Sequence, residues 1–165
     1  MADRIGAPPR LTVVRLSRGH PSDAHLAAPW LLGGVKTLSY AVNSAARREA
    51  RRRGADDVIF TSTDGFVLDA PTAGVLVARG DQLRSTPVAG TGILASTSVA
   101  GILDRAPSEG LSGVYALEPA ADLTTADGVW LVSSSRGPCP VTAIDGEAVT
   151  VDEELVTAVN RLAGF

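Results

Sequence analysis

Several features that direct a chain to a particular class of protein are scarce or absent here. The 165 residues include one cysteine, Cys139, which excludes an intrachain disulfide and a zinc site built from several cysteines. No apolar run reaches the roughly 18 residues that cross a bilayer, and the first residues lack the apolar core of a secretory signal. The net charge of -3 supplies no positive field for nucleic acid. We therefore expect a cytoplasmic protein that binds neither membranes nor nucleic acid.

Lysine is almost absent from the sequence, and the one lysine, Lys36, is therefore a distinctive residue. Of the 15 basic residues, 14 are arginines and one is Lys36. An arginine cannot lose its proton at working pH and cannot form a Schiff base, whereas a lysine amine can do both. Lys36 is therefore a candidate catalytic residue. The chance presence of one lysine in a lysine-poor chain explains the same count.

The alternation of β-branched segments with turn residues predicts one domain of the α+β class. Asp64 with Gly65, and Gly80 with Asp81, are turn signals that favour a mostly antiparallel meander over an array of βαβ units. Strands are expected over residues 11–16, 57–62, 66–68, 75–78, 82–85, 113–117, 129–133 and 141–144. Three helices are expected, over residues 39–53, 97–105 and 151–162.

The ends of the expected elements carry two further predictions. Ser96 or Thr97 is the expected N-cap of the second helix, and Thr150 with Glu153 forms a capping box at the start of the third. The strand over residues 11–16 is followed by a long loop and has no sequential partner nearby. A start of this kind is typical of the tail of a larger unit.

Three side chains near the first helix and the first hairpin have the chemistry of an aldehyde cofactor site. Lys36 precedes the expected helix, where its amine can project into a cleft, and Tyr40 follows four residues later. Asp69 stands at the end of an expected strand, where a carboxylate can bind a pyridinium nitrogen. Asp69 also fits an ordinary turn before Pro71.

Two hydroxyl-rich segments are candidate anion sites. Residues 90–98 place glycines and hydroxyls at a helix N-terminus, where free amides and the helix dipole favour phosphate. Residues 133–136 end a strand with three serines and Arg136, a set that suits phosphate or a substrate carboxylate. A simple capped helix and a polar loop account for the two segments equally well. Taken with Lys36 and Asp69, they complete the parts of a pyridoxal phosphate site.

One alternative chemistry is disfavoured by its spacing. His20, Ser22 and Asp23 contain the residue types of a hydrolase triad, but they are neighbours in one loop. The groups of a triad need separated, rigid supports. His25 adds no spacing that suits metal ligands, so neither a hydrolase nor a metal site is expected.

Four segments of the sequence resemble the class IV aminotransferase family, the fold-type IV pyridoxal phosphate enzymes. They occur in the order and at the spacing typical of that family, and the resemblance extends from about Leu11 to the C-terminus. The segments are residues 34–40, 48–57, 64–72 and 92–98. The resemblance implies the barrel-like C-terminal domain of these enzymes over residues 31–165. It also implies that residues 1–30 are an arm and the last strand of a truncated N-terminal domain.

The resemblance assigns roles to three residues around the cofactor ring. Lys36 matches the lysine that forms the Schiff base with pyridoxal 5'-phosphate and later moves protons. Asp69 matches the carboxylate that pairs with the pyridine nitrogen, where the family usually has the longer glutamate. Tyr40 is expected to contact the cofactor, although the offset between this tyrosine and the lysine varies among subfamilies.

The same resemblance places cofactor phosphate and substrate contacts on hydroxyl and guanidinium groups. Thr97 and Ser98 match the phosphate-binding residues at a helix start. Ser134 or Ser135 matches a further phosphate or substrate contact, and Arg136 is expected to face the substrate.

Within the family the sequence most resembles aminodeoxychorismate lyases. These enzymes release pyruvate from 4-amino-4-deoxychorismate to leave 4-aminobenzoate for folate synthesis. Two alternatives stay open: a branched-chain or D-amino acid aminotransferase of the same fold, and a truncated member with impaired or no activity. Both enzyme readings imply a small amino acid-like substrate and a homodimer.

Overall fold

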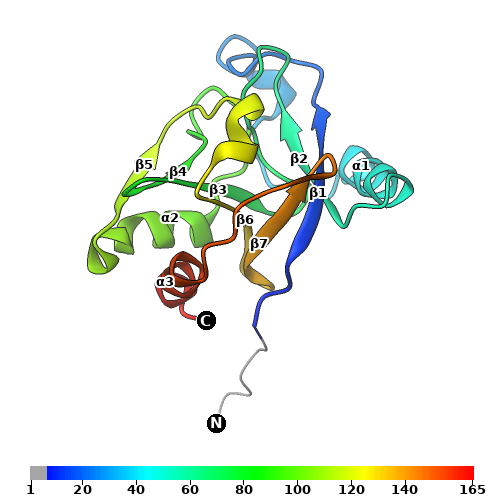
Figure 1. Cartoon of the computed structure of the whole chain (residues 1–165). Coiled ribbons are helices and arrows are strands. Elements are labelled where there is room, and N and C mark those ends of the chain that lie inside the picture. Colours follow the sequence, from blue (N-terminus) through cyan, green and yellow to red (C-terminus); the bar gives the residue numbers. More distant parts are fainter. Residues whose placement is uncertain (1–6) are drawn as a thin grey trace.

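The computed structural model describes residues 7–165, and its centre is one curved eight-stranded sheet (Figure 1). The strands follow the order β2-β1-β7-β6-β3-β4-β5, and β8 pairs with β7 beside this path. The strand bounds are β1 Leu11–Ser17, β2 Asp57–Thr61, β3 Gly74–Arg79, β4 Gln82–Ser85, β5 Ser112–Tyr115, β6 Gly128–Ser133, β7 Gly137–Ile144 and β8 Glu147–Ala148. The α+β class, the mostly antiparallel sheet and its half-barrel shape are confirmed.

The first strand is not isolated, which corrects the expectation drawn from its neighbours along the chain. β1 lies inside the sheet and pairs in parallel with β2 on one side and β7 on the other. The helix α1, Ala41–Arg52, connects β1 to β2, so the chain does contain one βαβ unit. Only β3–β4, β3–β6, β6–β7 and β7–β8 are antiparallel. The division of the chain near residue 30 stays a prediction.

Three α-helices cover the sheet, in agreement with the predicted number. α2, Thr97–Arg105, and α3, Glu153–Ala163, lie side by side against one part of the sheet, and α1 lies by β1 and β2 at the other end (Figure 1). Short 3-10 helices are η1 Pro29–Leu31, η2 Ala106–Glu109 and η3 Ala120–Thr125. Within residues 7–165, none of the helices has the length and apolar character needed to cross a membrane.

The two faces of the sheet bury different cores because side chains alternate along each strand. On β3, Leu76 and Ala78 pack with residues of α2 and α3, including Ile102. Val75 and Val77 point the other way into a second core, which β1, β2, β7 and η3 complete. The sheet therefore fixes the position of α2, and the N-terminus of α2 lies next to the first residue of β3.

The last helix, α3, has its N-cap two residues beyond the expected position, and the physical reason is local. Asp152, not Thr150, is the N-cap of α3: its carboxylate accepts hydrogen bonds from the amides of Glu154 at 2.9 Å and Leu155 at 3.2 Å. A carboxylate satisfies two of the orphan amides and also suits the positive end of the helix dipole. The predicted capping box is therefore wrong.

This cap supplies a test of local stability. We expect Asp152→Ala to lower the free energy of unfolding by about 1 kcal/mol, because two first-turn amides lose their acceptor. Thr150→Ala is the matched control and should change it by less than about 0.5 kcal/mol. Urea denaturation followed by circular dichroism measures both. Equal losses in the two variants would contradict this assignment of the cap.

Candidate cofactor site

A cavity of about 840 Å³ opens where five segments of the chain converge. The segments are the loop after β1, the chain before and into α1, the return of the hairpin after β2, the loop that leads into α2, and the end of β6. Six of the eight residues predicted for the site line this cavity. They are Lys36, Tyr40, Asp69, Thr97, Ser98 and Ser134. Its volume lies within the range typical of small-molecule and cofactor sites.

Lys36 stands on an irregular segment between η1 and α1. Two glycines hold this segment against the loop on the other side of the cavity. Gly34 has a positive φ of 77° and donates a backbone hydrogen bond to the carbonyl of Gly92 at 2.9 Å. A Cβ on Gly33 would lie 2.8 Å from the Cα of Gly92. The close approach of the two loops places Lys36 at the cavity wall.

Asp69 is fixed through its backbone by the hairpin that follows β2. Its carbonyl accepts a hydrogen bond from the amide of Phe60 at 2.7 Å, and the amide of Leu68 donates to Phe60 at 2.8 Å. Burial raises the pKa of Asp69 to about 6, against the smaller lowering effects of nearby Arg18 and His20. The side chain is therefore a desolvated carboxyl group poised to take a cationic partner.

The raised pKa of Asp69 predicts a pH dependence with a definite sign. The folded chain holds this proton up to about pH 6, whereas the unfolded chain loses it near the ordinary value of 3.8. The folded state binds more protons between these values, so this group lowers the free energy of unfolding as pH rises through that window.

Asp69→Asn removes that effect and leaves a side chain of similar shape. We expect the variant to match the wild type near pH 4 and to exceed it in unfolding free energy by about 2 kcal/mol above pH 7. Urea unfolding across this pH range measures the difference. Ser135→Ala, outside the cavity, is the control. A constant difference at every pH would contradict a raised pKa for Asp69.

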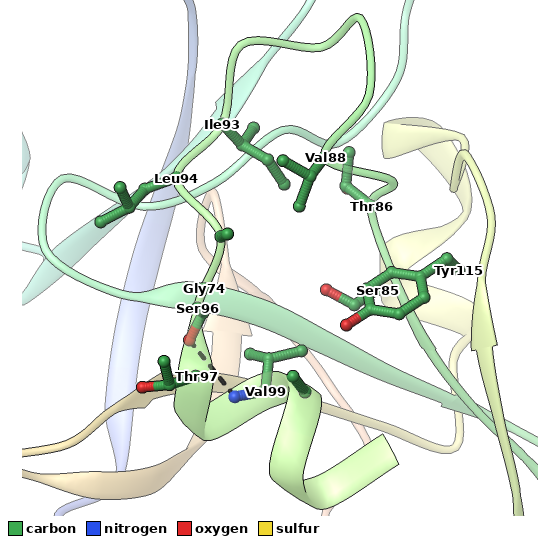
Figure 2. Close-up of a pocket in the computed structure, with 12 residues that line it drawn as sticks. Gly74, Ser85, Thr86, Val88, Ile93, Leu94, Ser96, Thr97, Val99 and Tyr115 are labelled. Carbon is green, nitrogen blue, oxygen red and sulfur yellow. Dashed lines mark hydrogen bonds between the residues drawn. The ribbon is translucent and has the colours of Figure 1, made fainter. Parts of the chain in front are cut away.

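The N-terminus of α2 supplies hydroxyls and amides to the cavity. Ser96 is the N-cap, and its hydroxyl accepts a hydrogen bond from the amide of Val99 at 3.2 Å (Figure 2). This confirms Ser96, one of the two residues predicted as the N-cap of this helix. The next residues, Thr97 and Ser98, begin the helix, where amides have no intrahelical acceptor and the dipole is positive. The arrangement can receive a phosphate group.

The end of β6 contributes differently from the expectation. Ser133 and Ser134 line the cavity, whereas Ser135 and Arg136 are not among the described residues that do. The guanidinium of Arg136 instead lies 3.2 Å from the carboxylate of Asp57, which is 1% exposed. The turn after β6 directs only its first serines toward the site.

Among the other residues that line the cavity, four were not assigned to it from the sequence although their side chains are basic or amide groups. They are Arg18, His20, His25 and Asn43, from the end of β1, the loop after it and α1. The parallel pairing of β1 with β2 positions the first three, and no local pattern in the sequence indicates that pairing.

The triad interpretation is contradicted by contacts in the same loop. The hydroxyl of Ser22 donates to the carboxylate of Asp64 at 2.7 Å and is thereby bound away from the histidines. His20 and His25 pack edge to face instead, with ring centroids 5.1 Å apart. No cluster of three metal-ligating side chains occurs in the part of the chain that the structure describes.

A second hollow of about 130 Å³ adjoins the loop that leads into α2 (Figure 2). Val88, Ile93 and Val99 line it together with Tyr115. The hydroxyl of Ser85, on its wall, donates to the carbonyl of Val75 at 2.8 Å and is therefore satisfied. The hollow is small and mainly apolar, so it suits a hydrocarbon group and not a cofactor.

Comparison with known proteins agrees with this geometry. Residues 6–144 match the family described as amino-transferase class IV. The chain belongs to this family. It is 42% identical over 142 residues to the bifunctional aminodeoxychorismate lyase / D-amino acid transaminase of Mycobacterium tuberculosis, a match that covers 82% of this chain and 49% of the relative. The chain spans about half the length of the curated relatives it matches.

Solved structures give the same result for the fold. A fold IV transaminase from Curtobacterium pusillum superimposes with a TM-score of 0.89 at 41% identity, covering 100% of this chain and 57% of the other. The pyridoxal phosphate-bound form of a hypothetical aminotransferase from Mycobacterium tuberculosis does so with a TM-score of 0.88 at 37% identity, covering 94% and 54%. The family uses pyridoxal phosphate.

The groups around the large cavity have the chemistry that this cofactor requires. It needs an amine for its aldehyde, an anion for its ring nitrogen and donors for its phosphate. Lys36 supplies the amine, Asp69 the carboxyl group, and Thr97 and Ser98 the hydroxyls at a helix N-terminus. All four face one cavity although they come from three separate segments of the sequence. The residues present fit the group.

Proposed function

We propose that this chain binds pyridoxal 5'-phosphate and supplies the cofactor-binding half of an aminodeoxychorismate lyase. The observation that carries the proposal is the convergence of the only lysine, the carboxyl group of Asp69 and the start of α2 on one cavity. Lys36 would hold the cofactor covalently and move protons, Asp69 would bind the ring nitrogen, and Thr97 with Ser98 would hold the phosphate. The bound cofactor supplies electron withdrawal from the substrate.

The 42% identity to a bifunctional enzyme whose name includes both activities supports the lyase reaction and transamination alike. The lyase is the first candidate because the sequence most resembles aminodeoxychorismate lyases within the family. The reaction converts 4-amino-4-deoxychorismate to 4-aminobenzoate and pyruvate, and aromatisation of the ring drives it. A D-amino acid transaminase is the second candidate, supported by the same relative and by the D-alanine aminotransferase of Bacillus licheniformis at 28% identity. Transamination needs a keto acid as a second substrate, which discriminates the two.

Cofactor binding is tested first, by titrating the purified chain with pyridoxal phosphate and following visible absorbance. Borohydride reduction and peptide mass mapping then locate the bound cofactor. We expect saturable binding with the label on Lys36, since only the N-terminal amine competes. Label at Met1 alone, or no saturable signal, would refute the proposal.

The reaction is tested next by release of 4-aminobenzoate and pyruvate, and separately by transfer from D-alanine to 2-oxoglutarate. Because the chain spans about half of its curated relatives, we expect slow turnover by this chain alone. A cavity open to water loses substrate positioning and water exclusion. Transfer without lyase activity would support the second candidate. A chain that binds the cofactor but catalyses neither reaction would match the third alternative, a truncated family member with impaired or no activity.

We further propose that the chain acts as a homodimer. Support comes from large apolar side chains exposed along the segment that carries Lys36. They are Leu26, Trp30, Leu31, Leu32, Val35, Leu38, Tyr40 and Val42. Contiguous exposed apolar surface of this kind marks an interaction site.

A single substitution tests the dimer. Leu38 is 97% exposed, so Leu38→Asp should leave the fold intact and shift the chain toward the monomer in sedimentation velocity. We expect at least a tenfold weaker dimer, since a buried charge costs more than about 1.4 kcal/mol. Val88→Asp, on a separate loop, is the control. A wild-type chain that is monomeric at all concentrations would refute the proposal.

A further inference from the structure

Arg18 directly follows β1 and lines the large cavity, and two contacts fix its side chain. The guanidinium carbon lies 4.5 Å from the centroid of the Phe60 ring, in a cation–π arrangement. One guanidinium nitrogen donates to the side-chain oxygen of Asn43 at 3.2 Å. The backbone amide of Arg18 donates to the carbonyl of Thr61 at 2.8 Å. This arginine is therefore held at the wall of the cavity.

Both contacts lead to the segment that carries Asp69. Phe60, under the guanidinium, donates its amide to the carbonyl of Asp69 at 2.7 Å. Asn43, at the other end, donates its side-chain amide to the carbonyl of Pro71 at 2.8 Å. Arg18 thus contacts two residues that hold this segment. Phe60 binds the backbone of Asp69, and Asn43 binds the backbone of Pro71. Among residues 7–165, no carboxylate lies within 4.0 Å of the Arg18 guanidinium, so its charge is not neutralised by a direct ion pair.

We propose that Arg18 is a positioning residue that keeps Asp69 ionised and aimed into the cavity. The inference rests on the proposed function, because an anionic Asp69 is useful there as the partner of a pyridinium nitrogen. Arg18 need not touch the cofactor or the reacting atoms. Its role is to oppose the desolvation that would otherwise hold a proton on Asp69.

The other groups around Asp69 do not replace this charge. His20 also lines the cavity, but its ring packs against His25, and burial lowers the pKa of His25. The lowered pKa of His25 favours its neutral form, so this imidazole supplies little positive charge. The backbone amide of Leu94 also favours the ionised carboxylate, as does the charge of Arg18. Lys36 lines the cavity too, but its amine is the group the cofactor would consume.

The test measures the titration of Asp69 directly, in the chain without cofactor. Carbon-13 NMR of the Asp69 carboxyl carbon is recorded against pH for the wild type, Arg18→Met, Arg18→Gln and Arg18→Lys. Methionine retains the apolar stem over Phe60, and glutamine retains a donor for Asn43. Arg10→Met is the control, because Arg10 pairs with Glu153 on the surface. Asp69→Asn identifies the resonance.

We expect the pKa of Asp69 to rise by about one unit in Arg18→Met and Arg18→Gln, and to stay near the wild-type value in Arg18→Lys and Arg10→Met. If binding requires the ionised carboxylate, pyridoxal phosphate affinity should fall by about fivefold at pH 6 and by about twofold at pH 7 in the two neutral variants, and should recover as pH rises past the new pKa. An Asp69 pKa unchanged by either neutral variant would overturn the inference. So would an equal loss of affinity in Arg18→Lys that does not depend on pH, because that marks a packing role.

Different results would contradict the proposed function and the role of Arg18. If the wild type binds no cofactor but the Asp69 pKa still rises without Arg18, the proposed function fails and the electrostatic role stands. If the cofactor binds at Lys36 but the Asp69 pKa is insensitive to Arg18, the positioning role fails and the proposed function stands.

Discussion

Lys36→Arg should abolish covalent capture of pyridoxal phosphate by this chain. The substitution keeps a positive charge on a long flexible stem, so the electrostatics of the cavity change little. A guanidinium cannot lose its proton at working pH and cannot condense with an aldehyde. Because Lys36 is the only lysine, no other side-chain amine is available to replace it. We expect no cofactor to be trapped on an internal peptide after borohydride reduction.

Any lyase or transaminase activity should fall with it, on the order of a thousandfold, since the group that moves the proton is also lost. The matched control is Arg48→Lys, which adds an exposed lysine on α1 away from the cavity. Label should remain on Lys36 in that variant and stay off residue 48. Comparable labelling of residue 48 would show that the capture reflects general amine reactivity and would remove the main support for the site.

The second large effect is structural and concerns Gly113 on β5. A Cβ at this position would lie 2.2 Å from the carbonyl oxygen of Leu103 and 2.8 Å from its Cα. These are backbone atoms of α2, and Leu103 with Ile102 is buried in the core beneath the helix. The helix cannot retreat without opening that core. We expect Gly113→Ala to lower the free energy of unfolding by about 3 kcal/mol, and the melting temperature by about 6–12 °C.

Two neighbouring variants separate the overlap from other costs of substitution. Ser112→Ala, in an exposed position on the same strand, should change stability by less than about 0.5 kcal/mol. Gly110→Ala has nothing within 4 Å but a φ of +72°, so it should cost about 1 kcal/mol from backbone strain alone. Urea and thermal unfolding measure all three. A loss in Gly113→Ala no larger than in Gly110→Ala would show that α2 adapts.

Gly113→Ala also links the fold to the site. The start of α2 carries Thr97 and Ser98, so a displaced helix moves the proposed phosphate donors as well. Cofactor affinity should therefore fall in the folded fraction of Gly113→Ala, whereas Asp152→Ala at the N-cap of α3 should leave it unchanged.

Local chemistry accounts for the parts of the fold that were predicted correctly. Strands such as β2 and β6 are runs of β-branched and apolar residues bounded by turn residues, and Ser96 precedes a helix that it caps through a bond only three residues away. Interactions of this range are encoded in neighbouring residues. The error at α3 is of the same scale, because Asp152 competes for the cap only two residues beyond Thr150.

The sequence by itself determined the α+β class, the three helices and six of the residues that line the cavity, since a rare lysine, a strand-end carboxyl group and a hydroxyl-rich helix start are local signals. Only the tertiary structure decided that β1 lies between β2 and β7, and thereby that Arg18 and His20 line the same cavity as Asp69. It also decided that Arg136 is bound to Asp57. Strand pairing and ion pairing join residues distant in the sequence, and their energies depend on burial that no short segment specifies.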